Sequence, residues 1–454
     1  MARVAIVGGG LTGLAAAWHL RDRHEVVLFD AAQPGGQIKT IGMDGVAFDV
    51  GAEAFIARQP HMLALVRALG FADDVVHPAL SRVALRIGDK LRPLPQHTVM
   101  GAPTSLRALA ASGVLGPTAL LRASIEPLLP RRPFGGDSSV AEVIGSRFGS
   151  AVTDLLAEPL LSGVYAGRAD RLSAAATAKS IWDAAKTPQS LLAGLARQRQ
   201  QTQADDRPVF ATVQGGLGRV VEKLTANLGT AVRDHEPVRA LAHQDDGSWQ
   251  IATDQDTVNV DQVVLAVPAG VAAQLVAPLD TEVAAMLALL RTVSVAVVAL
   301  SYNRADACSA PNVSGVLVPR RDDRLVKAVT VSANKWAHLN RADRFMVRAS
   351  VGRDELGQTP AWTELDDDAL IHRVDAEVRD LLHLDRRAKV RCVVRWHDAL
   401  TQYEVGHLER VSRIDEAVSR WPGLHLGSAA YTGLGLASRA ADAGRLSAAV
   451  DART

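Results

Sequence analysis

The sequence predicts an α/β fold built on a discontinuous, Rossmann-like dinucleotide-binding domain, accompanied by an antiparallel-sheet domain and a helical insert. Three stretches support this fold class. Residues 4–30 combine strand, glycine-rich turn, helix and strand, residues 263–267 form a continuous apolar strand, and residues 424–436 run from a short strand into a glycine-containing helix start. An apolar strand of this kind is typical of a parallel sheet that is covered on both faces.

The first element is a strand–turn–helix unit whose turn has the glycine spacing of a phosphate-binding motif. Gly8 permits a tight turn, Gly10 lets the backbone approach a pyrophosphate, and Gly13 lets the helix pack closely on the strand. The free N–H groups and the positive dipole end of the helix then face the phosphates. The predicted contacts are Gly8, Gly9, Gly10, Leu11, Thr12 and Gly13.

The second strand of this unit ends in Asp30, whose carboxylate can accept hydrogen bonds from both hydroxyls of an adenosine ribose. The same charge disfavours a ribose phosphate, which argues against NADP. Gly35 and Gly36 follow closely and allow the backbone a second approach to the cofactor. A Pro-Gly surface turn is the alternative interpretation of this pair.

The middle of the chain changes from helical to strand patterns. Asp44-Gly45 lies between apolar runs and predicts a β-hairpin. Residues 60–200 are rich in Ala, Leu and Arg and are mostly helical in pattern. Later β-rich runs, with a helix at 366–384, predict a second, largely antiparallel sheet. We therefore expect a dinucleotide-binding domain from residues 1–80, 206–270 and 420–454, a helical insert at 81–205 and a substrate-binding domain at 271–419.

The C-terminal segment also carries a candidate cofactor contact. Residues 424–429 predict a short strand, after which Gly433-Leu434-Gly435-Leu436 opens a helix that runs to about residue 450. If that strand joins the dinucleotide sheet, the amides at the helix start suit a ring edge that becomes anionic on reduction. An ordinary strand-to-helix loop is the alternative.

The composition excludes several classes of function. The chain of 454 residues has 50 Lys and Arg against 49 Asp and Glu, which argues against nucleic acid as a partner. Cys308 and Cys392 are the two cysteines and have no metal-binding spacing, so we expect no metal and a reducing cytoplasm. We expect neither a signal peptide nor a membrane-spanning segment. Arginines interrupt the apolar surface of the helical insert at positions 107, 122, 131 and 132.

With these residues in view, the chain resembles the flavin-dependent porphyrinogen oxidases, which include protoporphyrinogen oxidase and the coproporphyrinogen III oxidase of Gram-positive bacteria. The resemblance covers nearly the full length and implies a flavin amine oxidase-like fold. Its more specific segments are residues 158–167 (EPLLSGVYAG), 171–173, 215–216, 395–396, 402–403, 406–407 and 431–436. Residues 49–58 resemble a flavin-contacting loop of the family, in which Ala52 stands where proline is frequent.

The resemblance implies FAD as the cofactor. Beyond the glycine turn, Asp30, Gly35 and Gly36, it assigns cofactor contacts to Lys39, Gly51, Ala52, Glu53, Ala54, Val238, Trp396, Leu434, Gly435 and Leu436. For Val238, a place beside the adenine and a place in the hydrophobic core are both open. Arg58, Arg82 and Arg168 are the candidates for binding substrate carboxylates, and a solvated surface arginine is the alternative for each.

The resemblance further implies a six-electron oxidation of coproporphyrinogen III to coproporphyrin III, with oxygen as the acceptor and release of hydrogen peroxide. Protoporphyrinogen IX oxidation, amine oxidation and a non-catalytic FAD-binding role are the alternatives. No side chain is predicted to be catalytic, because the flavin itself accepts the hydride, and His397 and His407 are expected to be structural. A transient contact with the next haem-pathway enzyme is also implied.

Overall fold

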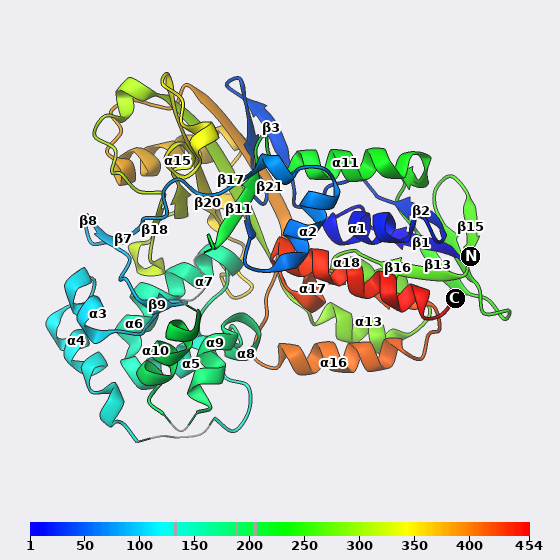
Figure 1. Cartoon of the computed structure of the whole chain (residues 1–454), viewed down its shortest axis with the longest axis horizontal. Coiled ribbons are helices and arrows are strands. Elements are labelled where there is room, and N and C mark those ends of the chain that lie inside the picture. The colour runs from blue at the N-terminus through cyan, green and yellow to red at the C-terminus, as the bar shows by residue number, and fades with distance from the viewer. Residues whose placement is uncertain (131–133, 188, 203–206) are drawn as a thin grey trace. The chain divides into compact units, whose positions relative to one another are not determined.

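The computed structural model describes residues 1–130, 134–187, 189–202 and 207–454, and the chain divides into two compact units (Figure 1). The first unit comprises Met1–His77, Arg207–Arg291 and Glu409–Thr454, and the second comprises Pro78–Asp206 and Thr292–Leu408. No helix in the described part of the chain is long and apolar enough to cross a membrane. Arg131 and Arg132, noted in the sequence, lie outside the described residues.

The first unit is organised by a five-stranded parallel sheet with the strand order β12-β2-β1-β16-β22. The tail strand β22 pairs with β16, so the C-terminal segment joins the dinucleotide sheet as the sequence predicts. The strands are β1 (Arg3–Val7), β2 (Glu25–Phe29), β12 (Val232–Arg233), β16 (Gln262–Leu265) and β22 (Leu424–Leu426).

Each face of this sheet is covered by a separate hydrophobic core. Val4 and Ile6 of β1 pack with the helices on one face, whereas Ala5 and Val7 pack with those on the other, as the two-residue period of a strand requires. On the first face lie α1 (Leu11–Leu20), α2 (Pro60–Ala68), α11 (Gly218–Leu228) and α18 (Leu436–Asp451), and α1 runs beside α18 and α11 (Figure 1). On the second lie α12 (Ala269–Val276), α13 (Thr281–Ala288) and α16 (His407–Val418).

Smaller β elements complete the first unit. Asp44 and Gly45 both have positive φ angles, 50° and 77°, and form the tight turn of the predicted hairpin. The elements are β3 (Thr40–Met43) with β4 (Val46–Asp49), the sheet β5 (Phe55–Ile56), β11 (Phe210–Val213) and β6 (Val75–Val76), the sheet β13 (Ala240–His243), β14 (Trp249–Ala252) and β15 (Thr257–Val260), and the short helices η1 (Ala72–Asp74), η4 (Gly229–Ala231) and α17 (Ala429–Thr432).

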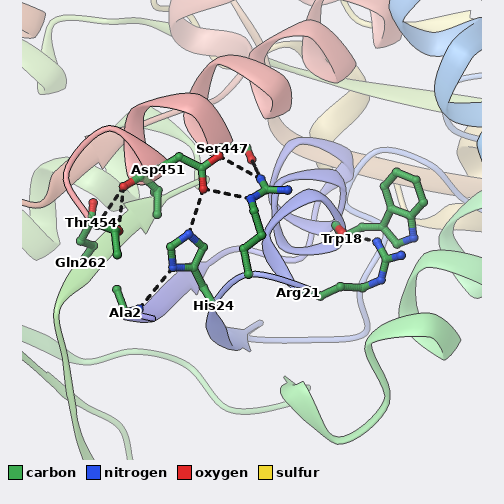
Figure 2. Close-up of polar contacts among 10 residues, drawn as sticks. Ala2, Trp18, Arg21, His24, Gln262, Ser447, Asp451 and Thr454 are labelled. Atoms are coloured by element: carbon green, nitrogen blue, oxygen red, sulfur yellow. Dashed lines mark hydrogen bonds and ion pairs between the residues drawn. The ribbon is translucent and has the colours of Figure 1, made fainter.

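Polar contacts tie the end of α18 to the start of the chain (Figure 2). The Ala2 N–H donates to His24 Nδ1 at 3.3 Å, so the His24 proton sits on Nε2, which donates to Asp451 Oδ1 at 2.9 Å. Arg23 adds a bond of 2.9 Å to Asp451 Oδ2 and one of 3.1 Å to Ser447 Oγ. Hydrogen bonds from Arg23 and His24 hold the pKa of Asp451 below its usual value.

The second unit contains a seven-stranded sheet with the order β21-β17-β20-β19-β18-β7-β8, antiparallel except where β18 runs parallel to β7. Helix α15 (Asp367–Leu382) packs on it and begins where Asp366 accepts the Ala369 N–H at 2.7 Å. The strands are β7 (Val83–Ile87), β8 (Lys90–Pro93), β17 (Thr292–Asn303), β18 (Gly315–Leu317), β19 (Val326–Thr330), β20 (Arg344–Val351) and β21 (Val390–Thr401).

Helices of the second unit enclose a core of their own, which includes Val140, Phe148 and Leu161. They are α3 (Leu106–Ser112), α4 (Pro117–Ser124), α5 (Val140–Phe148), α6 (Ser150–Val152), the π-helical turn η3 (Thr153–Ala157), α7 (Glu158–Tyr165), α8 (Ala174–Thr177), α9 (Lys179–Ala185) and α10 (Leu191–Thr202). Short elements elsewhere are β9 (Thr98–Val99), β10 (Ala102–Pro103), α14 (Ser332–Lys335), η2 (Glu126–Leu128), η5 (Arg304–Ala307), η6 (Arg320–Asp322), η7 (Ala337–Leu339) and η8 (Ala361–Glu364).

One local expectation from the sequence is wrong. Residues 83–87 and 90–93, expected within a helical insert, are strands of the seven-stranded sheet, because β7 pairs in parallel with β18. Residues 236–238 form a loop that precedes β13. Internal contacts group the helices and the antiparallel sheet as one unit, and the division into three domains stays a prediction.

Candidate cofactor-binding site

Two glycines of the first turn are required by close backbone contacts. Gly8 has a φ of 108°, and a Cβ there would lie 2.5 Å from the Ala266 carbonyl oxygen. A Cβ on Gly13 would lie 1.9 Å from the carbonyl oxygen of Gly8. Any side chain at either position would therefore force the turn away from the sheet or the helix away from the turn.

The start of α1 leaves hydrogen-bonding groups open. Gly10 caps the helix without a side-chain hydrogen bond, and no atom lies within 4 Å of the position that a Cβ on Gly10 would occupy. Thr12, only 3% exposed, has a buried Oγ1 with no hydrogen-bond partner among the described residues. An uncapped helix start beside an unpartnered hydroxyl fits the pyrophosphate of a dinucleotide.

Asp30 fixes the other end of this turn. Its Oδ2 accepts the Gly9 N–H at 2.5 Å and its Oδ1 accepts the Ala32 N–H at 2.8 Å. Burial raises the pKa of the Asp30 carboxyl, and these two N–H groups oppose that rise. Each oxygen keeps lone pairs for the hydroxyls of a ribose, whereas the Gly9 N–H is already engaged and is not free for a phosphate.

The second pair of glycines lies directly on the first turn. The Gly35 N–H donates to the Gly9 carbonyl oxygen at 2.8 Å, and Gly10 and Gly35 form an isolated parallel bridge. A Cβ on Gly36, whose φ is 55°, would lie 3.2 Å from Gly10 Cα. The double-glycine segment is thus part of the same site and is not a remote surface turn.

The loop containing Gly51 to Ala54 packs against the segment that follows these glycines. The Ala52 N–H donates to the Gln37 carbonyl oxygen at 2.8 Å, and the Val50 N–H donates to the Lys39 carbonyl oxygen at 2.9 Å. A Cβ on Gly51 would lie 2.1 Å from the Gln37 carbonyl oxygen. Glu53 and Ala54 are half-buried, and the Lys39 side chain is exposed.

Arg439 connects this region to the C-terminal helix, and sequence reasoning missed it. Its Nη2 donates to Gln37 Oε1 at 2.9 Å and its Nε donates to the Leu434 carbonyl oxygen at 3.2 Å. Helix α18 starts just after Gly435, which provides no side-chain cap, and Leu436 is buried. The structure therefore brings residues 434–436 to the same region as the second glycine segment.

Val238 lies close to Asp30 along the backbone, because the Glu236 N–H donates to the Asp30 carbonyl oxygen at 2.8 Å. The Val238 side chain is half-buried and packs against the core formed with β14 and α12. A contact of Val238 with an adenine stays a prediction, alongside its observed packing role.

In the second unit, Trp396 lies on β21 opposite Val295 of β17. It is half-buried against Ala166, Val293 and Val295, whereas Arg395 next to it bonds Asp367 at 2.9 Å. The motif at 158–167 forms α7 and its C-terminal turn, which receives a hydrogen bond of 2.8 Å from Gln402 Nε2 to the Tyr165 carbonyl oxygen. Segments 158–167 and 402–403 are thus hydrogen-bonded to each other.

The three candidate arginines differ in how much their side chains are engaged. Arg168 forms a bidentate pair with Asp170 at 2.9 and 2.7 Å, and that pair lowers the pKa of Asp170. Arg58, in the first unit, donates to the Arg207 carbonyl oxygen at 2.9 Å. The exposed Arg82 side chain has no ion pair or hydrogen bond with any described residue. A substrate-binding role stays a prediction for all three.

The two histidines expected from the sequence to be structural, His397 and His407, differ in burial. His407 is 1% exposed and stacks on Tyr403 with ring centroids 4.3 Å apart, while His397 is exposed. Within the described ranges, no group of three His, Cys, Asp or Glu residues is arranged to hold a metal ion.

Comparison with known proteins shows which family the chain belongs to. The sequence profile described as "Flavin containing amine oxidoreductase" matches residues 11–450. The chain belongs to this family. This flavin-containing oxidoreductase is 30% identical to the coproporphyrinogen III oxidase of Bacillus subtilis (strain 168) over 95% of the chain and 94% of that protein. It is 33% identical to the coproporphyrinogen III oxidase of Mycobacterium tuberculosis (strain H37Rv) over 97% and 95%.

Solved structures agree with this assignment. A protein of Exiguobacterium sp. 255-15 that is provisionally named protoporphyrinogen oxidase superposes with a TM-score of 0.88 at 28% identity, covering 100% of this chain and 99% of that one. Putrescine oxidase superposes with a TM-score of 0.67 at 17% identity over 100% and 99%, which shows the shared fold alone. The sequence predictions of the family, the flavin amine oxidase-like α/β fold and an FAD-dependent oxidoreductase are confirmed.

Proposed function

We propose that this flavin-containing oxidoreductase oxidises coproporphyrinogen III to coproporphyrin III in haem biosynthesis. The observation that carries the proposal is the similarity of 30–33% along nearly the entire chain to proteins named coproporphyrinogen III oxidase. Two of the segments that point to this branch from sequence, residues 158–167 and 402–403, support it because the bond from Gln402 to the Tyr165 carbonyl oxygen joins them within the second unit.

The reaction removes six electrons and six protons from the substrate and passes them to three molecules of oxygen, which leave as hydrogen peroxide. When bound, FAD would accept a hydride at its N5 atom from a meso carbon of the substrate. The helix start at Leu11–Gly13 and the Thr12 hydroxyl bind the pyrophosphate, and Asp30 accepts from the ribose. Lys39, Gly51 to Ala54 and residues 434–436 of the first unit position the ring. A contact of the ring with Trp396 of the second unit stays a prediction from the resemblance. These side chains orient the two reactants and exclude water, and none acts as a nucleophile.

A site for substrate carboxylates requires cations. Of the three candidate arginines, Arg82 is favoured because its guanidinium has no hydrogen bond or ion pair with any described residue. Replacing Arg82 with Met is expected to raise KM for coproporphyrinogen III about tenfold, equivalent to ~1.4 kcal/mol, with little change in kcat. The matched control is Arg107→Met, which removes an exposed arginine on α3. Equal KM values for the two variants would remove Arg82 from the proposed substrate site.

Protoporphyrinogen IX oxidation is the second candidate. It is favoured by the similarity to the rice chloroplastic protoporphyrinogen oxidase, 26% identical over 95% of the chain, and by the Exiguobacterium structure. The two substrates differ in two propionates against two vinyl groups, so additional free cations favour the coproporphyrinogen. A cytoplasmic location and a transient contact with the next haem-pathway enzyme belong to this proposal as well.

The deciding experiment supplies each porphyrinogen separately to the FAD-loaded protein in air and follows porphyrin fluorescence together with peroxide. We expect kcat/KM to be at least about tenfold higher for coproporphyrinogen III, a difference of ~1.4 kcal/mol. A preference for protoporphyrinogen IX would establish the second candidate. Failure of both substrates to bleach the flavin without oxygen would favour a non-catalytic FAD-binding protein, and bleaching by amines alone would favour an amine oxidase.

A further inference from the structure

The peptide between Leu434 and Gly435 lies just before the first turn of α18. Gly435 is the N-cap of this helix, and its N–H group has no hydrogen bond to any residue that the structure describes. Gly435 is also exposed, and no atom beyond its chain neighbours lies within 4 Å of the position that a Cβ would occupy. An accessible backbone donor is therefore present at the positive end of a 16-residue helix.

The side chain of Arg439 holds the opposite side of this peptide. Arg439 is half-buried, and its Nε donates to the Leu434 carbonyl oxygen at 3.2 Å. The peptide is trans, so its C=O and N–H bonds point in opposite directions. Because Arg439 holds the carbonyl, the Gly435 N–H points away from the guanidinium and stays available to a ligand.

The other end of the guanidinium anchors this peptide to the rest of the cofactor site. Arg439 Nη2 donates to Gln37 Oε1 at 2.9 Å. Gln37 directly follows Gly36, and its carbonyl oxygen accepts the Ala52 N–H at 2.8 Å. One side chain thus connects the start of α18 with the double-glycine segment and with the loop that contains Gly51 to Ala54.

The position of Arg439 is unfavourable for the helix itself. Arg439 is the fourth residue of α18, which starts at Leu436 and has no acidic residue in its first turn. A cation near the N-terminus of a helix is repelled by the helix dipole. A local cost of this kind is typical of a residue that serves a binding site, and the two hydrogen bonds to Leu434 and Gln37 offset it.

We propose that Arg439 is a positioning residue for the flavin and that it raises the reduction potential of bound FAD. By holding the Leu434 carbonyl oxygen, Arg439 directs the Gly435 N–H toward the edge of the isoalloxazine ring that becomes negatively charged on reduction. A hydrogen bond to a charged acceptor is stronger than one to a neutral acceptor, so this donor stabilises the reduced ring more than the oxidised ring. The inference rests on the predicted contact of residues 434–436 with FAD and does not depend on which porphyrinogen is oxidised.

The test measures the reduction potential of the FAD-loaded full chain by anaerobic equilibration with a dye of known potential. Arg439→Met removes both hydrogen bonds, so we expect reduced FAD to lose about tenfold more affinity than oxidised FAD, which lowers the potential of a two-electron couple by ~30 mV. Arg439→Lys keeps the positive charge but lacks the planar fork that bridges two acceptors, and we expect about half of this shift. The matched control is Arg453→Met, which removes an exposed arginine just after α18 and should keep the wild-type potential.

The potential separates positioning of the flavin from a purely structural role of Arg439. A loosened fold would weaken the binding of oxidised and reduced FAD equally and leave the potential unchanged, whereas positioning changes the ratio of the two affinities. If Arg439→Met does not retain FAD, Arg439→Lys gives the same comparison. An unchanged potential in either FAD-loaded Arg439 variant, or an equal shift in Arg453→Met, would overturn the proposal. No porphyrinogen is added, so a failure of the proposed oxidation would leave this result intact.

Discussion

The two units of this flavoprotein present their functional groups in different ways. In the first unit, the site is made mainly by backbone: Gly8 and Gly13 allow close contacts, and the start of α1 is uncapped. In the second unit, the family-specific residues are held by side chains, as in the Glu158–Arg320 pair and the Gln402–Tyr165 bond. A backbone site depends on a few glycines, whereas a side-chain network depends on partners that are distant in the sequence.

The strongest test of the backbone site is Gly13→Ala. Its methyl group would lie 1.9 Å from the Gly8 carbonyl oxygen, so we expect loss of FAD and of the folded first unit. The measurement is flavin absorbance and circular dichroism of the purified protein. Gly444→Ala, where a Cβ meets nothing within 4 Å, is the control and should retain FAD. A yellow, folded Gly13→Ala protein would contradict the predicted role of the turn.

In the second unit, Glu158→Gln should lower the stability of the fold without changing the affinity for FAD. The carboxylate is 8% exposed and pairs with Arg320 at 3.1 Å, so its loss leaves this partly buried cation with the longer pair to Glu355 at 3.6 Å and the Asp354 carbonyl oxygen. We expect the free energy of unfolding to fall by about 1–3 kcal/mol. Urea unfolding gives this value, and FAD titration should give an unchanged Kd. A large loss of FAD affinity would mean that the two units are not independent in this respect.

Asp30→Asn tests the polar end of the backbone site. The amide cannot accept from Gly9, Ala32 and a ribose as a carboxylate does. We expect FAD affinity to fall about tenfold to a hundredfold, or ~1.5–3 kcal/mol, because hydrogen bonds to a charged acceptor are lost. Fluorescence titration of the apoprotein with FAD measures this change. Equal affinity in the two proteins would indicate that Asp30 only shapes the turn.

The smallest effect is expected at the contacts drawn in Figure 2. Arg23 and His24 hold the pKa of Asp451 below its unfolded value, so this carboxylate stabilises the fold above that value, and the contribution is lost as pH falls through the lowered pKa. Because Asp451 is 37% exposed, we expect only about 0.5 kcal/mol relative to Asp451→Asn. Urea unfolding between pH 6 and pH 2.5 should show the advantage of the wild type disappearing at the acidic end.

Much of the first unit was predictable because its signals are local. The strands β1, β2 and β16, the turn at Asp44-Gly45 and the attachment of β22 follow from short patterns of apolar residues and glycines. The pairing of β7 with β18 was not predicted, because the two strands lie far apart along the chain and no local pattern near residue 83 indicates a parallel partner.

The same limit applies to the site. Gly35, Gly36 and Asp30 were identified from spacing and lie together in the structure. Arg439 was missed, because a single arginine on a helix has no signature and its partner Gln37 is 402 positions away.

The bond between Gln37 and Arg439 also bears on when a growing chain can bind its cofactor. Gln37 and the glycine turn are synthesised before α18, so this bond cannot form until Arg439 has been made. FAD binding should therefore follow the synthesis of α18, and chains that are cut before α18 should remain apoprotein however much cofactor the cell supplies.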